Sequence, residues 1–175
     1  MEYLIILLPL FGSIISGFFG ERLGDKTCQV LTSSLVLISS IFSLIIFYQV
    51  IFFDYTSNSI IFNWISSGNF YINWSIYIDP LTSVMFVVVT LISSVIHFYS
   101  IGYMKHDPHK PRFMAYLSLF TFAMLMLVTA DNFLQLFFGW EGVGLCSYFL
   151  IGFWFKKDSA NAAAIKAFVV NRVGD

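Results

Sequence analysis

The longest uncharged run of residues is the feature that most constrains this chain. Residues 27–53 contain no Asp, Glu, Lys or Arg over 27 positions, whereas an α-helix needs only about 20 apolar residues to cross a bilayer. Four more runs contain at most one such residue each, and they are 3–20, 80–101, 113–130 and 133–155. The sequence therefore predicts five membrane-spanning helices, and residues 160–175 predict the start of a sixth.

The overall composition supports a membrane protein and excludes several other classes. Charged residues make up 11% of the chain and hydrophobic residues 58%, with a mean hydropathy of +0.82, whereas soluble domains contain about 25% charged residues. Disorder requires low hydrophobicity and high net charge, and the net charge here is −1. Nine basic residues against ten acidic ones also argue against a nucleic-acid partner. We expect the chain to contact membrane lipids instead.

Residues 54–79 have a different pattern from the apolar runs. Ile, Phe, Trp and Tyr alternate there with Asn and Ser, and Ser67-Gly68-Asn69 is a turn signal. The two flanking runs, 60–65 and 70–78, predict a small β-hairpin. The predicted fold class is thus an all-α membrane protein with five full transmembrane helices, the start of a sixth and one hairpin.

The polar loops predict how the chain is oriented in the membrane. The loops after the first, third and fifth helices share one side, which we name the basic side, and they hold Arg22, Lys26, Lys105, Lys110, Arg112, Lys156 and Lys157. The opposite loops hold Asp54, Asp79 and Asp131 and no Lys or Arg. The positive-inside rule places the basic side in the matrix or cytoplasm. The amino terminus, which has no basic signal or transit segment, and the hairpin are then expected on the outer side.

Glu141 is the principal candidate functional residue. It is the ninth residue of the fifth predicted helix, Phe133–Phe155, and a charge near the bilayer centre costs about 2.5–3.5 kcal/mol on insertion scales. Glycines at 139, 142 and 144 leave room beside it for a partner helix or for water. The sequence predicts a residue that takes up and releases protons. The alternative is a glutamate held by a buried structural partner.

The sixth predicted segment adds charges of both signs, and the third adds a histidine. Arg172 and Asp175 are three residues apart and share a helical face, so they predict either a structural ion pair or a pair that tunes Glu141 or passes protons onward. Lys166 either snorkels to the interface or lines a polar path. His97 lies about one turn from a basic-side loop and could load protons from water. Its alternative role is an interfacial histidine bonded to a carbonyl.

No pattern predicts a cofactor or a metal in this chain. Cys28 and Cys146 lie in apolar runs and are interpreted as buried free thiols, and no Cys/His cluster has metal-ligand spacing. The glycine-rich stretch 139–144 does not follow a strand and carries an acid where a phosphate would bind, so it is not interpreted as a dinucleotide site.

Two long motifs, GWEGVGLCSY and NRVGD, and the stretch IDPLTSVMFVVVTLISSVIHFYSIGYM resemble chain 5 of NADH:ubiquinone oxidoreductase, respiratory complex I. The resemblance covers the whole chain and is strongest to mitochondrially encoded versions. It implies the amino-terminal part of an antiporter-like subunit that couples NADH oxidation and ubiquinone reduction to proton pumping. Glu141, Arg172, Asp175 and Lys166 match residues of the family's fifth and sixth helices.

The resemblance also implies a setting for the chain. FMN, iron–sulfur clusters and ubiquinone are expected in other subunits, with none in this chain, and the location is the mitochondrial inner membrane beside other membrane-arm subunits. Family members are far longer, so the fold is expected to continue after Asp175. The continuation is either a separate chain from a split gene or a further segment of the same chain. The alternatives are a subunit of a related Na⁺/H⁺ antiporter complex and a structural fragment kept for assembly.

Overall fold

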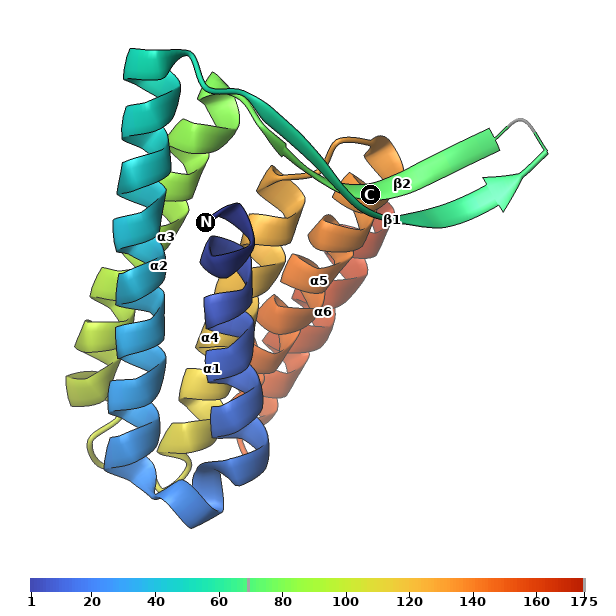
Figure 1. Ribbon diagram of the computed structural model, residues 1–175. Helices are drawn as coiled ribbons and strands as arrows, with labels where there is room; N and C mark the ends of the chain where they lie inside the picture. Colours follow the sequence, from blue (N-terminus) through green and yellow to red (C-terminus); the bar gives the residue numbers. More distant parts are fainter. Residues whose placement is uncertain (69, 175) are drawn as a thin grey trace.

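The computed structural model describes every residue except Asn69 and Asp175. Its elements are α1 (Glu2–Leu23), α2 (Asp25–Phe53), β1 (Ser57–Ser67), β2 (Phe70–Ile78), α3 (Pro80–Tyr103), α4 (Lys110–Val128), α5 (Phe133–Ile151) and α6 (Asp158–Gly174). The helices run side by side and alternate in direction, and the hairpin of β1 and β2 extends away from one end of the bundle (Figure 1). The predicted fold class is confirmed, because α1 to α5 are long and apolar enough to cross a membrane.

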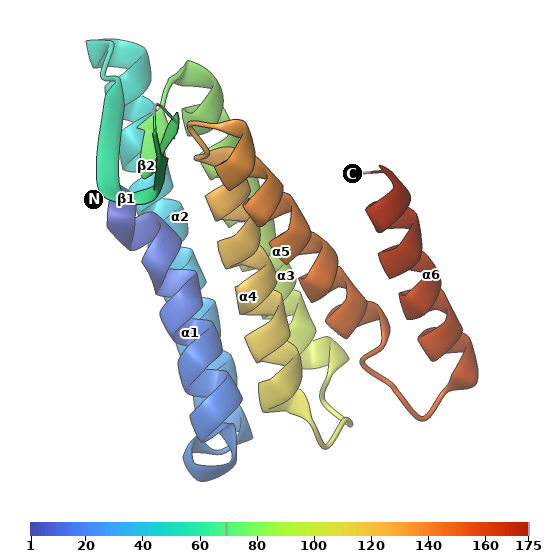
Figure 2. The ribbon, with the colours of Figure 1, turned by 90° about the vertical axis from the view of Figure 1, so that its right-hand side faces the viewer.

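Helix α4 occupies the centre of the bundle. It packs against α1, α2, α3 and α5, whereas the described part of α6 packs mainly against α5. Figure 2 shows this difference, with α6 standing at the edge of the bundle. The helices therefore form a dense group around α4 and a more open pair, α5 and α6.

Polar residues at the helix starts explain why two of the helices begin where they do. The Asp79 carboxylate accepts a hydrogen bond from the Thr82 amide at 2.7 Å, and Pro80 follows it at the first position of α3. The Asn132 side chain accepts from the Gln135 amide at 2.9 Å at the start of α5. Such caps satisfy amide groups that the first helical turn leaves without partners.

Several helix boundaries differ from those predicted. The polar turn expected between the first two helices is reduced to Gly24, because its φ of +80° reverses the chain at a single residue while the charged neighbours stay helical. Helix α4 begins earlier than predicted because Pro111 favours the first turn. Helix α5 ends at Ile151 instead of Phe155, since Gly152 starts the turn that leads to α6. Helix α3 continues to Tyr103, and α6 begins at Asp158 instead of residue 160.

Small polar side chains share the interior of the bundle with apolar ones, and large apolar side chains cover its surface. Small hydroxyl side chains of α2 and α3 are buried, and they include Ser33, Ser39, Ser40, Ser43, Thr90 and Ser94. Large apolar side chains such as Phe18, Phe52, Leu81 and Phe133 are exposed. This pattern suits a bilayer, because lipid solvates apolar side chains and small residues allow helices to approach and hydrogen bond. An apolar core does lie at the hairpin end, formed by Ile5, Ile6, Ile46, Val50, Ile76, Ile78, Phe86, Leu125 and Met126.

The hairpin is attached to the turn between α4 and α5 by hydrogen bonds to its second strand. The Ser75 amide donates to Gln135 Oε1 at 3.1 Å, and Gln135 Nε2 donates to the Ser75 carbonyl at 2.7 Å. The Tyr77 amide donates to the Thr129 carbonyl at 3.1 Å. A fully buried amide side chain thus pairs with the strand as a neighbouring strand would. The predicted hairpin is confirmed, although β1 is longer than the run that predicted it.

The base of the hairpin is also tied to the amino terminus. The Glu2 carboxylate accepts a hydrogen bond from the Tyr55 hydroxyl at 2.6 Å and longer ones from Ser57 and Ser59. The hydrogen bond to Glu2 raises the pKa of Tyr55 above its ordinary value, because it favours the protonated phenol. Glu2 therefore fixes the start of α1 against the strand that follows α2.

Candidate functional site

Glu141 lies on the face of α5 that looks toward α6, because the glycines of α5 bring its other face against α4. A Cβ atom at Gly139 would lie 2.6 Å from Leu127 Cα, and one at Gly142 would lie 3.3 Å from Ala123 Cβ. The approach at Gly139 leaves no room for a side chain, and the approach at Gly142 is tighter than most Cβ contacts. The glycines therefore set the position of α5, and through it the depth and direction of Glu141.

The structure pairs Glu141 with Arg172. The Arg172 guanidinium donates a hydrogen bond to Glu141 Oε1 and forms an ion pair with it. The side chain of Glu141 is 19% exposed and that of Arg172 is 50% exposed. The guanidinium also lies 5.0 Å from the ring centroid of Phe168, in a cation–π contact. An acid in the middle of an apolar helix is thus compensated by one cation from the neighbouring helix.

The other charged candidates of the sixth helix do not join this pair within the described part of the chain. Lys166 is exposed on α6 and forms no ion pair with a described residue. Asp175, expected beside Arg172, lies outside the described residues. Its role stays a prediction.

His97 lies apart from Glu141, in the interface of α3 and α4. Its side chain is fully buried, its Nδ1 lies 2.7 Å from the Ser93 carbonyl, and its Nε2 lies 3.0 Å from Ser118 Oγ. A carbonyl oxygen can only accept, so Nδ1 carries a proton and donates. In the neutral ring Nε2 then accepts from the Ser118 hydroxyl. The histidine is bonded to a carbonyl, as one interpretation of the sequence expected, and its side chain is buried within the protein.

Hydroxyl side chains continue from His97 along the helix interfaces. Ser93 Oγ is hydrogen bonded to Thr121 Oγ1 across α3 and α4, and Ser43 Oγ lies 2.8 Å from Thr90 Oγ1 across α2 and α3. Hydroxyl groups both donate and accept, so such contacts can reverse their direction.

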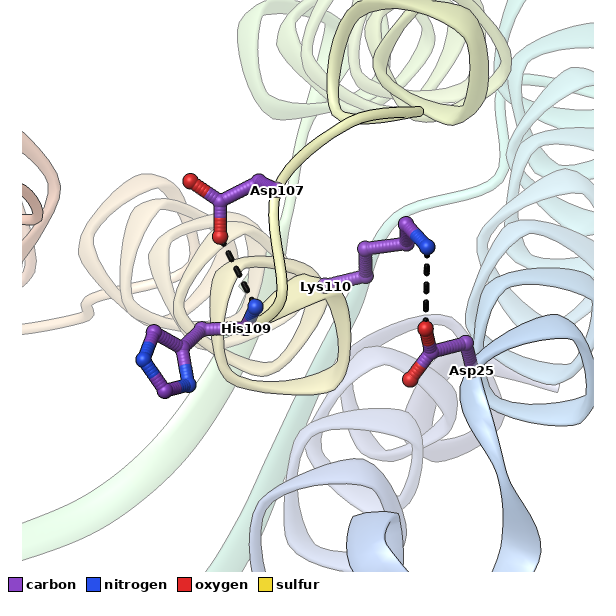
Figure 3. Close-up of polar contacts among 4 residues, drawn as sticks. All are labelled: Asp25, Asp107, His109 and Lys110. Carbon is purple, nitrogen blue, oxygen red and sulfur yellow. Dashed lines mark hydrogen bonds and ion pairs between the residues drawn. The ribbon is translucent and has the colours of Figure 1, made fainter.

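The loops of the basic side are held together by a second group of contacts. Lys110 Nζ lies 2.9 Å from Asp25 Oδ2, and Asp107 Oδ1 accepts from the His109 amide at 2.8 Å (Figure 3). Trp154, in the turn after α5, donates its indole N–H to Asp107 Oδ2 at 2.9 Å. Arg112 lies 4.7 Å from the ring centroid of Phe153 and donates to its carbonyl at 3.3 Å. The turn that leads to α6 is therefore attached to the loop between α3 and α4.

The environment of Asp107 shifts its pKa. Burial acts to raise the pKa of Asp107, but the hydrogen bonds from the His109 amide and the Trp154 indole act against burial. Together with the nearby charges of His109 and Arg112, they bring the pKa below its ordinary value. The carboxylate form is thus the one that holds the two loops together.

Sequence reasoning missed three polar side chains that the structure shows to be important. Gln135 clamps the hairpin, Glu2 anchors its base and Ser118 completes the hydrogen bonds of His97. A lone amide within an apolar run was a usable signal for Gln135, but the partners of all three residues are distant in sequence. Cys28 and Cys146 are free and buried, as predicted. Among the described residues, no group of His, Cys, Asp and Glu could hold a metal ion.

Comparison with known proteins assigns the chain to a family. A family model described as "NADH-Ubiquinone oxidoreductase (complex I), chain 5 N-terminus" matches residues 64–114, and one described as "NADH:quinone oxidoreductase/Mrp antiporter, TM" matches residues 130–175. The chain belongs to the chain 5 family of complex I. The second match contains both Glu141 and Arg172.

Individual relatives agree with the family models along the whole chain. NADH-quinone oxidoreductase subunit L of Rickettsia bellii is 56% identical over 98% of this chain and 27% of its own length. NADH-ubiquinone oxidoreductase chain 5 is 58% identical in Arabidopsis thaliana and 53% identical in Chondrus crispus, in each case over 100% of this chain and 26% of the relative. The chain spans about a quarter of the length of the curated relatives it matches.

Proposed function

We propose that this chain acts within a proton-translocating membrane-arm subunit of NADH:ubiquinone oxidoreductase. The observation that carries the proposal is the ion pair of Glu141 and Arg172 between two helices, α5 and α6, in the segment that matches the antiporter family model. An ionisable residue within a membrane helix is costly and marks an ion or proton pathway. The names of the relatives supply the larger reaction, in which NADH is oxidised and a quinone is reduced.

Each charged candidate has a role in this proposal. Glu141 takes up and releases the proton, and Arg172 is its partner across α5 and α6. Lys166 and Asp175 pass the proton onward from the pair. His97 loads protons from the basic side.

The wider setting is part of the same proposal. FMN, iron–sulfur clusters and ubiquinone belong to other subunits of the complex, and this chain contributes helices and titratable groups without redox chemistry. Its partners are the neighbouring membrane-arm subunits and lipids of the mitochondrial inner membrane. The basic-side loops face the matrix, and the hairpin faces the intermembrane space.

Replacing Glu141 with Gln in the intact complex tests the proposal. We expect Glu141→Gln to lower the number of protons pumped per NADH oxidised while the assembled complex stays abundant, because Gln keeps the shape but cannot release a proton. Glu141→Asp, which keeps the carboxyl group, should retain part of the pumping. Unchanged pumping in Glu141→Gln would refute the proposal, and a loss of assembled complex would indicate a structural anchor instead.

A second candidate function follows from the description of the second family model, which includes Mrp antiporters. In this case the chain serves a Na⁺/H⁺ antiporter complex without redox subunits. Purification of the native complex separates the two functions. Co-purifying flavin and iron–sulfur subunits support the first, and sodium-dependent proton exchange without them supports the second.

A further inference from the structure

We propose that the seam between α2, α3 and α4 is a water-filled path along which protons reach His97 from the basic side. From the basic side the seam is lined by Gln29, Ser33, Ser100, Ser118 and His97, and it continues beyond His97 with Ser93, Thr121, Ser43 and Thr90. The inference rests on the proposed function, because it names the route by which a proton-translocating subunit loads one of its titratable groups.

The first observation is the alignment of polar side chains on α2 and α3. Ser43 and Thr90 are hydrogen bonded across the two helices. Ser33 lies ten residues before Ser43, and Ser100 lies ten residues after Thr90, so each is about 15 Å from the contact in the direction of the basic side. Both are buried. Because α2 and α3 pack against one another along antiparallel axes, the two serines are at the same depth.

The second observation is that two buried polar groups of α2 have no protein partner. Gln29 is 6% exposed and Ser33 is 1% exposed, and neither Gln29 Nε2 nor Ser33 Oγ bonds to a described residue. Gln29, Ser33 and Ser43 are separated by four and ten residues, which keeps them on one stripe of the helix. Buried polar groups are nearly always hydrogen bonded, to water where no protein group is near. Water is therefore the ligand that these two groups require.

The third observation is that the seam leads to a titratable group. His97 accepts from Ser118 through Nε2, and the neighbouring Ser93 is bonded to Thr121 on α4. A proton arriving by water reaches the Ser118 hydroxyl, which passes its own proton to Nε2 and takes up the new one. The ring then carries protons on both nitrogens, and Nε2 donates to Ser118. No bond other than O–H and N–H bonds forms or breaks in this step.

The seam stops short of Glu141, on the other side of α4. Gly142 and Gly139 lie beside Ala123 and Leu127, which places Glu141 level with the middle of that stretch of α4. Thr121 is about one helical turn nearer the basic side. The seam and the ion pair therefore lie at similar depth on opposite sides of α4, which separates them.

Substituted cysteines in the intact membrane complex test the seam directly. Ser33→Cys and Ser100→Cys change one atom each, and Ser34→Cys on the exposed face of α2 is the matched control. Membranes are treated with aminoethyl methanethiosulfonate from the basic side, and the rate at which each introduced cysteine is labelled is measured on peptides of this chain. The unsubstituted chain, which contains Cys28 and Cys146, gives the background labelling. The reagent attacks the thiolate, which forms far more readily at a hydrated thiol than at one buried in apolar surroundings.

We expect Ser33→Cys and Ser100→Cys to be labelled several-fold faster than Ser34→Cys. Labelling at position 33 should then lower the protons pumped per NADH oxidised, whereas labelling at position 34 should not. Equal labelling at positions 33 and 34 would overturn the seam, and so would labelling at position 33 that leaves pumping unchanged. The labelling rates do not depend on Glu141, so a failure of the seam is distinct from a failure of the proposed function.

Discussion

The surroundings of His97 and those of Glu141 show two ways of placing a titratable side chain in a membrane helix. His97 is fully buried in the dense group around α4, and hydroxyl and carbonyl groups satisfy both of its nitrogens. Glu141 lies in the open pair of α5 and α6, and a half-exposed arginine compensates its charge. A neutral imidazole needs only dipoles, whereas a carboxylate needs a cation. The first environment stabilises a neutral side chain, and the second stabilises a charged one.

The largest expected loss of stability comes from a substitution that moves α5 and so changes the environment of Glu141 but not that of His97. Gly139→Ala would place a methyl group 2.6 Å from Leu127 Cα, and overpacking against backbone costs about 3 kcal/mol. We expect the assembled complex to melt at a lower temperature and to lose the pairing of Glu141. Gly17→Ala is the control, because its Cβ would meet only Ala115 Cβ at 3.6 Å. Equal melting temperatures for the two variants would contradict the close packing of α4 and α5.

The next effect tests whether Glu141 depends on one cation. A double-mutant cycle of Glu141→Gln and Arg172→Gln should give a coupling energy of about 2 kcal/mol, as for contacting charges. The same cycle with Lys166→Gln should give none, since Lys166 is exposed and not paired with Glu141. Thermal stability of the purified complex measures both. Equal coupling energies for Arg172 and Lys166 would mean that any positive charge near α5 stabilises Glu141, without a specific ion pair.

A smaller effect tests the dipoles around His97. Ser118→Ala removes the hydroxyl that donates to Nε2, and such a hydrogen bond contributes about 1 kcal/mol to stability. We expect a measurable drop in the melting temperature of the complex. Ser34→Ala, on the exposed face of α2, should leave it unchanged. Retention of full stability in Ser118→Ala would show that another group, or water, donates to His97.

The smallest effect concerns the loops that connect the two environments. The folded-state pKa of Asp107 lies below its ordinary value of 3.8, so its contribution to stability is present above that value and is lost as the pH falls through the folded pKa. Wild type should be more stable than Asp107→Asn at about pH 5, and the difference should shrink at about pH 3. Melting temperatures at both pH values measure it. Asp54→Asn, at the end of α2, is the control, and a difference independent of pH would contradict the assignment.

Hydropathy predicted the five spans because each one satisfies its own backbone hydrogen bonds, so a local property decides whether it forms. The hairpin was also predictable, since its turn and its alternating residues are adjacent in sequence. Glu141 was recognised for the same local reason, as an acid within an apolar run. The sequence did not show that Gly24 alone forms the turn between α1 and α2. The charged residues on either side of it are helical because both helices pack together, and that packing is not visible in the sequence.

Side-chain partners were beyond sequence reasoning. Gln135 bonds to Ser75 and His97 bonds to Ser118, and these pairs are separated by 60 and 21 residues. Nothing in the spacing of either residue indicates its partner. The sequence suggested that Arg172 pairs with Asp175 on one helical face. In the described part of the chain, the packing of α6 on α5 instead places Arg172 against Glu141 and leaves Lys166 exposed.

The sequence by itself determined that this chain crosses a membrane with five helices, which loops are basic, and that an acid lies within the fifth helix. These properties depend on the transfer of each segment from water to lipid, which is a sum over its own residues. Only the tertiary structure decided that α4 is the central helix, that His97 is buried among hydroxyl groups, and that Arg172 pairs with Glu141. Contacts between distant segments depend on how the helices pack, and packing is set by shape and hydrogen bonding across the whole bundle.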